Sequence, residues 1–238
     1  MLRSEKSTQF NLACNQCKSH HRSLFNSLEE SNLDSVDLAK SCTRYKKGQA
    51  LFHEGTRPLG VFCVNRGRIK VYRIGIDGKE QITKISAAGD LLGYKALISQ
   101  QHYHVSAEAL DDCMICFIPK EDFLELLKPG GSFYMDILKA VCEENGLMAE
   151  KMTEMAQRSV RQRVALTLLM LRDTYGIEQD QEGEIEINLT REDLANIVGT
   201  ATESLIRLLN EFKKDELIET QGRKIRILDP QGLAKASE

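Results

Sequence analysis

The chain has 238 residues, of which 42% are hydrophobic and 28% are charged, and its formal net charge is −3. This composition is typical of a soluble protein with one or two domains, and the small negative charge excludes a chain that is basic throughout. No apolar run approaches the roughly 20 residues of a membrane span, and the polar first residues predict no signal peptide. Seven cysteines in such a chain predict reduced cytosolic thiols and no disulfide framework.

Two cysteines and two histidines lie close together near the start of the chain. Cys14 and Cys17 are separated by two residues, and His20 and His21 follow shortly after them in the stretch ACNQCKSHHRS. This spacing is compatible with a metal or cluster site, with a redox-sensitive thiol pair, or with residues that only take part in packing. The stretch alone does not choose between the three roles.

From Cys42 to Pro119 the sequence has the pattern of β structure. Short runs with alternating apolar residues, such as GVFCVNRGRIKVYRIG, are separated by glycines at turn-like spacing. Asp77-Gly78 lies between two such runs and is typical of a hairpin turn. Many short strands with regular turns predict a sandwich or roll. The region has no Gly-rich loop that opens a helix, which excludes a nucleotide cradle of the P-loop type.

The pattern becomes helical from Lys120. KEDFLELLKPGG predicts a short helix, and a long proline-free stretch begins at Ser132. Gly146 interrupts this stretch and marks either a close helix crossing or a kink. An apolar stripe of near-heptad spacing predicts that the long helix pairs with a copy of itself, although the stripe could also pack on the chain's own β domain. The members of the stripe are Ile137, Val141, Met148, Met152 and Met155.

The segment LTREDLANIVGTATESLIRLL, from Leu189 to Leu209, predicts two short helices joined by a tight turn. Thr190 is a good N-cap for the first helix, Gly199 ends it, and Thr202 can cap the second. Two helices joined in this way are typical of the helix-turn-helix arrangement. LIETQGRKIRILD then predicts a hairpin with its turn at Gln221-Gly222, which makes the arrangement the winged form.

The second of these helices carries a candidate base-reading pair. Glu203 and Arg207 are four residues apart, and they lie near the half of the helix that enters the major groove in this motif. Arg can bind guanine O6 and N7 with two hydrogen bonds, and Glu can accept from cytosine N4. A solvent-facing ion pair between the two, worth about 0.2–0.5 kcal/mol, is the alternative. Further candidates for contacts to DNA are Thr190, Arg191, Thr200, Thr202, Ser204 and, on the wing, Lys224.

With a β-roll, a long helix and a winged helix-turn-helix in this order, the chain resembles the Crp/Fnr family of bacterial transcription regulators. The resemblance is carried by KKGQALFHEG and GRIKVYRIGIDGKEQITKISAAGDLLG in the roll, and by LTREDLANIVGTATESLIRLLNEFKKDELIETQGRKIRIL at the C-terminus. It places Glu203 and Arg207 at the family's recognition positions. It implies a homodimer that binds double-stranded DNA at an inverted repeat, with half-sites about one helical turn apart, and that contacts RNA polymerase.

The resemblance also bears on the effector and on the DNA site. Members that bind cyclic AMP carry a Glu after the glycine of GDxxGE and an Arg-Ser pair further on, whereas this chain has Tyr94 and, before Ser106, Val105. Without these groups a ribose and a phosphate lose their charge-assisted hydrogen bonds, so we expect no binding of cyclic AMP. The position of Thr202 is Arg in the cyclic AMP branch, and its replacement implies a TTGA/TCAA-like half-site.

The oxygen-sensing branch of the family holds a four-iron cluster on three N-terminal cysteines, spaced C-x2-C-x5-C, and a fourth cysteine in the roll. By resemblance, Cys14 and Cys17 match the first two ligands, and Cys116 matches the fourth. The third position falls on Ser23, and a serine alkoxide is a poor substitute for thiolate at neutral pH. We therefore assign no cofactor, and Cys14, Cys17 and Cys116 stay candidates for an iron-sulfur cluster, a redox sensor, or packing. The cysteines that could replace the missing ligand are Cys42, Cys63 and Cys113.

We predict an α+β chain with an N-terminal β-roll that is similar to a cyclic-nucleotide-binding jelly roll, a long dimerisation helix and a C-terminal winged helix-turn-helix. The expected boundaries are an arm at 1–28, the roll at 29–130, the helix at 131–159 and the DNA-binding domain at 160–238. The predicted function is that of a cytoplasmic, homodimeric, sequence-specific transcription regulator, which is not an enzyme and has no membrane partner. The alternative is a ligand- or redox-sensing module that uses the roll without binding DNA.

Overall fold

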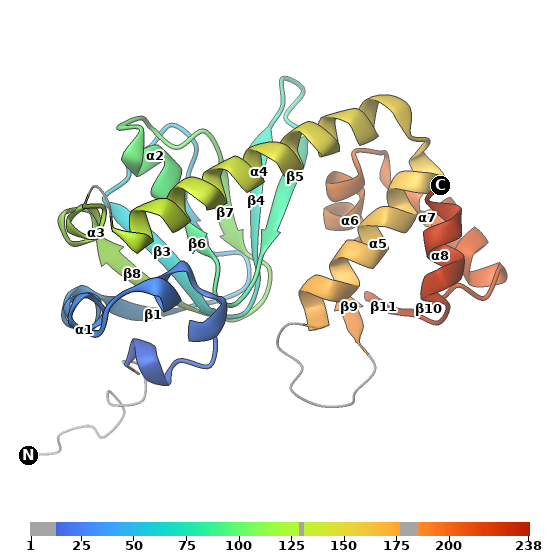
Figure 1. The fold of residues 1–238 in the computed structure, drawn as a ribbon. Coiled ribbons are helices and arrows are strands. Elements are labelled where there is room, and N and C mark those ends of the chain that lie inside the picture. Colours follow the sequence, from blue (N-terminus) through green and yellow to red (C-terminus); the bar gives the residue numbers. More distant parts are fainter. Residues whose placement is uncertain (1–12, 129–130, 177–184) are drawn as a thin grey trace, which may run out of the picture. The chain divides into compact units, whose positions relative to one another are not determined.

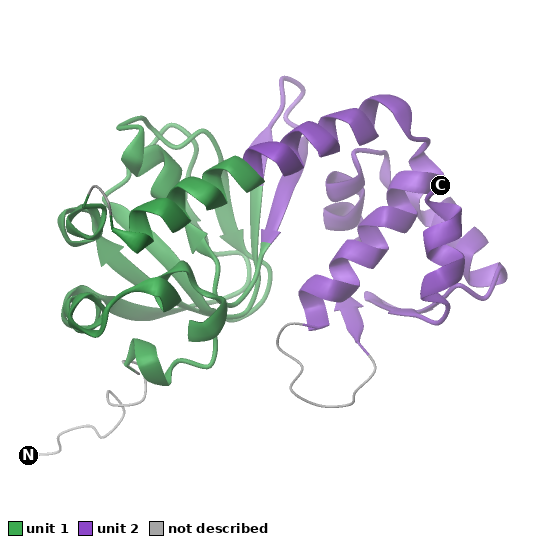
Figure 2. Cartoon of the chain, in the orientation of Figure 1, with its two compact units in different colours: residues 1–71, 86–143 green, residues 72–85, 144–238 purple. Residues whose placement is uncertain are grey.

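A computed structural model of the chain describes residues 13–128, 131–176 and 185–238 (Figure 1). The chain divides into two compact units, shown in different colours in Figure 2. The first unit comprises residues 1–71 and 86–143, and the second comprises residues 72–85 and 144–238. The first unit holds most of the strands. The second unit holds helices and one small sheet, together with the strand segments at residues 72–85.

Two four-stranded sheets make up the β-roll and confirm the architecture expected from the alternating apolar runs. One has the order β1-β8-β3-β6, with the strands at Ser41–Tyr45, Cys113–Pro119, Gly60–Arg66 and Leu91–Leu92. The other has the order β2-β7-β4-β5, with the strands at Ala50–Phe52, Ser106–Ala109, Ile69–Ile74 and Glu80–Ser86. In the first sheet, β8 lies between β1 and β3 and pairs antiparallel with both.

The period of two along the strands distributes apolar side chains between two cores. On β3, Val61 belongs to one core and its neighbour Phe62 belongs to the other, because successive side chains of a strand point to opposite faces. The core that holds Phe62 is rich in aromatic rings. Phe52 stacks on Tyr103 with ring centroids 4.0 Å apart, and Phe62 lies 5.1 Å from Phe117. Side chains therefore fill this part of the roll.

Short helices cover the core that holds Val61. Phe25, in the third of the N-terminal 3₁₀ turns, stacks on Phe133 with ring centroids 5.6 Å apart, which anchors the arm in this core. The helical elements of this unit are η1 (Cys14–Gln16), η2 (His20–Arg22), η3 (Leu24–Ser27), α1 (Glu30–Ala39), α2 (Tyr94–Ile98) and α3 (Lys120–Leu126). The helix α3 is the short helix predicted after the last strand of the roll.

The long helix α4 (Ser132–Gln157) has different surroundings along its length. Ile137, near its start, is only 4% exposed and belongs to the core of the first unit, and Val141 packs against that core. Further along, Met148 is 59% exposed and Met152 is 72% exposed. The predicted apolar stripe therefore has two parts, because Ile137 and Val141 are covered by the chain itself and the two methionines are not.

Gly146 lies inside α4 without interrupting it. A Cβ added at this position would meet nothing within 4 Å, so the glycine does not mark a close crossing with another described part of the chain. In the described part of the chain, no helix combines the length and the hydropathy that a bilayer crossing requires.

The rest of the second unit is a helical domain with a three-stranded sheet of order β10-β11-β9. Its elements are α5 (Val160–Gly176), β9 (Glu186–Asn188), α6 (Arg191–Val198), α7 (Thr202–Lys214), β10 (Ile218–Gln221), β11 (Lys224–Ile227) and α8 (Pro230–Ala236). The sequence patterns did not predict α8. Its cap is Asp229, which accepts a hydrogen bond of 2.9 Å from the Gly232 amide, and Leu233 is its buried anchor.

Candidate nucleic-acid interface

The helices α6 and α7 form the predicted helix-turn-helix. Thr190 caps α6, because its hydroxyl accepts a hydrogen bond of 2.9 Å from the Asp193 amide and thereby satisfies one of the free N–H groups at the helix start. Gly199 ends α6 with φ +73°, the left-handed conformation that glycine adopts most easily, and its amide donates to the Ala195 carbonyl. Local sequence signals therefore produce both ends of the first helix.

A half-buried arginine fixes the turn between the two helices. Arg163, on α5, donates to the Met155 carbonyl at 3.0 Å and to the Gly199 carbonyl at 3.3 Å. The Met155 methyl group lies 2.7 Å from the point where a Cβ at Gly199 would stand. The turn is thus tied both to the start of α5 and to the end of α4, and it has no room for a side chain.

The helix α7 has one buried side and one exposed side. The buried side consists of Leu205, Leu208, Leu209 and Phe212. Its N-cap is Ala201 and not Thr202, so the prediction of a Thr202 cap is wrong, because Thr202 already has helical conformation as the first residue of α7. Thr202 is half-buried at the start of the helix, and the cap residue Ala201 has no side chain that could accept a hydrogen bond.

The exposed side of α7 carries a shallow open hollow. Its walls are Glu203, Ile206, Arg207, Asn210, Glu211 and Lys214. Glu203 and Arg207 were predicted from the sequence, whereas Ile206, Asn210, Glu211 and Lys214 were not. The signal that could have found Ile206 and Asn210 is the helical spacing, because positions three, four and seven residues after Glu203 share its face.

Arg207 forms an ion pair with Glu211 at 2.9 Å, and its side chain is 69% exposed. The alternative partner considered from the sequence was Glu203, one turn earlier, but the guanidinium turns toward the C-terminal end of the helix. Glu211 also accepts from Arg161 at 3.0 Å, and Arg161 in turn contacts Asp215 at 3.0 Å. The Glu211 carboxylate therefore pairs with two guanidinium groups on this side of the domain.

The wing is the hairpin of β10 and β11, whose register pairs Gln221 with Lys224 around the predicted turn. Arg191, at the start of α6, donates to the Gly222 carbonyl at the tip of the wing at 2.9 Å. Lys224 pairs with Glu186 of β9 at 2.6 Å, and Arg226 pairs with Glu219. Both cations predicted to contact the DNA backbone outside α7, Arg191 and Lys224, thus have partners within the domain.

The structure brings the predicted DNA-contact residues to three neighbouring elements. Glu203, Ser204 and Arg207 lie on α7, and Thr200 lies in the turn before it. Thr190 and Arg191 stand at the start of α6, where one caps the helix and the other holds the wing tip, and Lys224 begins β11.

A disulfide joins Cys42 and Cys116, so the expectation of reduced thiols is wrong for these two residues. The reason is the strand register, since β1 and β8 pair antiparallel with Cys42 directly opposite Cys116. The other five cysteines are free, and they are Cys14, Cys17, Cys63, Cys113 and Cys142.

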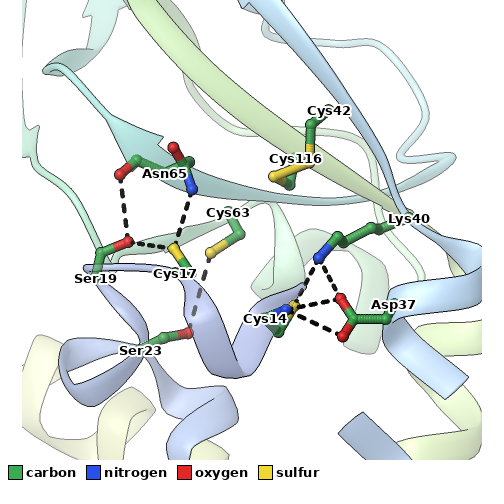
Figure 3. The surroundings of a disulfide bond; sticks show 10 residues. All are labelled: Cys14, Cys17, Ser19, Ser23, Asp37, Lys40, Cys42, Cys63, Asn65 and Cys116. Atoms are coloured by element: carbon green, nitrogen blue, oxygen red, sulfur yellow. Dashed lines mark hydrogen bonds and ion pairs between the residues drawn. A yellow bond between two sulfur atoms is a disulfide. The ribbon is translucent and has the colours of Figure 1, made fainter. Parts of the chain in front are cut away.

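Cys14 lies beside a buried lysine and an aspartate (Figure 3). The Lys40 ammonium donates to the Cys14 thiol at 3.1 Å and also pairs with Asp37, and the Asp37 carboxylate accepts from the Cys14 amide at 2.8 Å. Burial nevertheless raises the pKa of Cys14 to about 11, because the loss of solvent outweighs the stabilisation of the thiolate by Lys40. Burial likewise raises the pKa of Cys63 to about 12. Both thiols are protonated at neutral pH.

The residues that match the cluster ligands of the related branch do not fit a four-iron cluster. Cys116 is occupied by its disulfide bond, and the Ser23 hydroxyl accepts from the Phe25 amide at 3.2 Å. Among residues 13–128, 131–176 and 185–238, no three side chains of Cys, His, Asp or Glu are arranged to hold a metal ion. The Cys63 sulfur lies 4.0 Å from the Ser23 oxygen, at the position of the missing ligand.

The positions that distinguish the cyclic AMP branch lie within the roll. Tyr94 is buried at the start of α2, and the half-buried Val105 precedes β7. The hydroxyl of Ser106 accepts a hydrogen bond of 3.0 Å from the Glu54 amide, so it is already engaged by the chain. The expectation that cyclic AMP does not bind stays a prediction.

The chain is similar to known proteins in both units. It matches the cyclic nucleotide-binding domain over residues 42–129 and the Crp-like helix-turn-helix domain over residues 162–236. The fold is that of solved Crp/Fnr structures. A transcriptional regulator of the CRP/FNR family from Thermus thermophilus has a TM-score of 0.69 at 21% identity, over 83% of this chain and 98% of that one. FixK2 from Bradyrhizobium japonicum has a TM-score of 0.73 at 18% identity, over 84% and 98% of the two chains.

Curated relatives extend the similarity to nearly the whole chain. The transcriptional activator protein Anr of Pseudomonas protegens is 27% identical over 91% of this chain and 89% of its own. The fumarate and nitrate reduction regulatory protein of Vibrio cholerae serotype O1 is 30% identical over 91% of this chain and 86% of its own. Together with the helix-turn-helix of the second unit and the roll of the first, these matches show that the chain belongs to the Crp/Fnr family of transcription regulators.

Proposed function

We propose that this Crp/Fnr-type regulator acts as a homodimer that reads an inverted repeat with a TTGA/TCAA-like core. The observation that carries the proposal is the exposed side of α7, where Glu203, Ile206, Arg207 and Asn210 stand opposite a fully buried apolar side. A helix of this kind presents its N-terminal half to the major groove. The domain is a regulator's DNA-binding domain and not an enzyme.

In this proposal each group has a separate task. Arg207 leaves Glu211 and binds guanine O6 and N7, and Glu203 accepts from cytosine N4. Thr200, Thr202 and Ser204, in the turn and the first turn of α7, donate to phosphate oxygens, which position the helix without reading sequence. Arg191 acts indirectly, because it holds the wing tip at Gly222 at the start of the helix-turn-helix.

The surface proposed for dimerisation is the exposed side of α4. Six positions alternate at spacings of three and four, which is the pattern of a two-stranded coiled coil, and they are Met135, Leu138, Cys142, Asn145, Ala149 and Met152. This row replaces the predicted stripe in part, because Ile137 and Val141 are covered by the roll. Asn145 inside such a seam favours one register and two strands.

The cellular setting follows from the same proposal. A regulator that binds promoters works beside RNA polymerase in the cytoplasm, and we propose the polymerase as its protein partner. We further propose that cyclic AMP is not the effector. Tyr94 and Val105 support this, because they stand where the cyclic AMP branch has the Glu and Arg side chains that bind the nucleotide. The aromatic rings of Phe52, Phe62 and Tyr103 also pack together inside the roll.

Selection from a random pool of duplexes tests the function without a target chosen in advance. The full chain is expected to recover sequences with two inverted TTGA-like half-sites whose centres lie about one helical turn apart. A pool recovered by the Arg207→Ala variant should lose the preference at one base pair of each half-site. Recovered duplexes with no shared sequence would contradict the proposal.

A further inference from the structure

Three cysteines lie in one row across the first sheet of the roll. The register places Cys116 of β8 directly opposite Cys42 of β1 on one side and directly opposite Cys63 of β3 on the other. Residues directly opposite in antiparallel strands point to the same face, with Cβ atoms about 4.5–5.5 Å apart. Cys116 therefore has two cysteines as immediate neighbours and is bonded to one of them, Cys42.

The row faces the core that the N-terminal arm covers. Val61 lies two residues before Cys63 on β3, and Ile118 lies two residues after Cys116 on β8, so both share the face of the row. Both belong to this core, and Cys63 packs against it. Cys113 belongs to the core on the opposite face, where its thiol donates to the Asp111 carbonyl at 3.2 Å. Cys63 is thus the one free cysteine of the sheet that shares a face with the disulfide, among the described strands.

The arm is fastened to β3 over the Cys63 thiol (Figure 3). The Ser23 oxygen lies 4.0 Å from the Cys63 sulfur. Two residues further along the strand, the side-chain amide of Asn65 donates to the Cys17 sulfur at 3.0 Å, and the backbone carbonyl of Asn65 accepts from the Ser19 hydroxyl at 3.3 Å. As long as these contacts hold, the arm lies over the half-buried Cys63 and its Ser23 hydroxyl contacts the Cys63 sulfur.

We propose that Cys116 is the shared sulfur of two alternative disulfides, Cys42–Cys116 and Cys63–Cys116, and that release of the arm from β3 opens the second. The Cys63 thiolate attacks the Cys116 sulfur, the Cys63–Cys116 bond forms as the Cys42–Cys116 bond breaks, and Cys42 leaves as a thiolate that takes up the proton lost by Cys63. One disulfide and one thiol exist before and after the step, so it needs no oxidant or reductant.

The exchange moves the cross-link from β1–β8 to β3–β8 and leaves Cys42 as the free thiol. The new bond links β8 to β3, the strand that the arm contacts. Which disulfide is present therefore depends on whether the arm is bound to β3. Disulfides of intracellular proteins are commonly transient and redox-sensing, which suits a bond with two alternative partners. The inference goes beyond the proposed function, because none of the residues that read DNA takes part.

Disulfide mapping in the full chain tests the proposal. The Cys42→Ser variant is treated with diamide, a two-electron thiol oxidant, its free thiols are blocked with N-ethylmaleimide, and its peptides are identified by mass spectrometry. The Cys63–Cys116 peptide is expected as the main cross-link. Adding Asn65→Ala, which removes a contact of the arm to β3, should make it form several-fold faster. The matched control Cys113→Ser should keep Cys42–Cys116.

Two results would overturn the proposal. In the oxidised Cys42→Ser variant, N-ethylmaleimide on both Cys63 and Cys116 would show that neither thiol had formed a disulfide. A cross-link from Cys116 to Cys14 or Cys17 would show that Cys63 is not its second partner. If circular dichroism shows that Cys42→Ser does not fold, the unaltered chain in a glutathione buffer at pH 8 decides, since the Cys63–Cys116 peptide must appear beside Cys42–Cys116. DNA binding is measured on the same samples, so a failure to bind DNA counts against the proposed function alone.

Discussion

Arg207 already has a partner in the domain, which it must leave before it can bind a base as we propose. Its guanidinium pairs with Glu211 at 2.9 Å on the exposed side of α7, and Glu211 also holds Arg161. Exposed pairs of this kind are worth roughly 0.2–1 kcal/mol, so the exchange for a guanine is inexpensive. A bidentate pair with the correct base is worth about 1–3 kcal/mol of discrimination, which exceeds that cost.

Replacing Arg207 with alanine should therefore cost about 1–3 kcal/mol of binding free energy on the target site and much less on a scrambled duplex. Fluorescence anisotropy with labelled duplexes measures both affinities. Lys214→Ala is the matched control, since Lys214 lines the same hollow on α7. It should weaken binding to the two duplexes equally, as expected of a contact that reads no sequence. An equal loss for Arg207→Ala on both duplexes would show that it does not read a base.

Glu211→Gln should improve discrimination, because it removes the carboxylate that holds Arg207. We expect a several-fold rise in affinity for the target at low salt, with a smaller rise for the scrambled duplex. Asp215→Asn removes the same charge and the other partner of Arg161 but leaves Arg207 paired. If both variants raised the two affinities by the same factor, the effect would be general electrostatics and not release of Arg207.

The free cysteines should differ widely in their reaction with iodoacetamide. Thiolate is the nucleophile, and burial raises the pKa of Cys63 and of Cys113 to about 12, so both are almost fully protonated at neutral pH. Cys142 is exposed on α4 in the single chain but belongs to the proposed seam, so it should be labelled first in the Met152→Asp variant, where the seam is opened. Because pH 7 to 9 lies below a pKa of about 12, labelling of Cys63 and Cys113 should quicken about tenfold per pH unit. Mass spectrometry of timed samples would refute this if Cys63 reacted as fast as Cys142.

At the scale of the element, the turn between α6 and α7 depends on its glycine. Gly199→Ala places a Cβ at φ +73° and 2.7 Å from the Met155 methyl group, so it should lower the free energy of unfolding by more than the roughly 1 kcal/mol of the left-handed conformation alone. The control is Gly146→Ala inside α4, where a Cβ meets nothing within 4 Å and should add on the order of 1 kcal/mol. Urea unfolding measures the stability of both variants. Similar unfolding midpoints for the two would contradict the requirement for glycine at position 199.

The seam proposed on α4 predicts which charged substitution separates the dimer. Met152→Asp places a carboxylate inside the seam, where burial of an unpaired charge is costly, and should shift sedimentation toward the monomer. Leu147→Asp makes a similar change on an exposed residue, 63% accessible, on the side of the helix away from the seam, and should leave the dimer intact. If the two variants sedimented alike, the seam would lie elsewhere.

At the scale of the whole molecule, the sequence predicted the features that have local causes. Thr190 caps the start of α6, and Gly199 ends the helix with a left-handed turn. Alternating apolar residues predicted the strands of the roll. Pairing over long distances could not be predicted in this way. Cys42 and Cys116 are 74 residues apart, and only the register of β1 on β8 brings them together. The same limit explains Ile137, since its spacing suits a seam and its burial depends on the roll.

The candidate site divides along the same line. Helical spacing predicted the shared face of Glu203 and Arg207, and the same spacing brings Glu211 beside Arg207. The partners Glu186 and the Gly222 carbonyl come from packing of the small sheet and the wing. The sequence patterns did not predict α8, because this helix is short and contains Gly232. The partners of these cations within the domain were therefore not predicted, and their contacts with DNA stay a prediction.

Equilibrium binding of the unaltered chain to an inverted-repeat duplex and to its scrambled counterpart, over a range of salt concentrations, tests the central claim most directly. We predict at least about a hundredfold preference for the repeat, and a steep linear fall of log affinity with log salt on both duplexes because phosphate contacts release counterions. A binding curve that is flat in salt, or equal for both duplexes, would contradict a sequence-specific DNA reader.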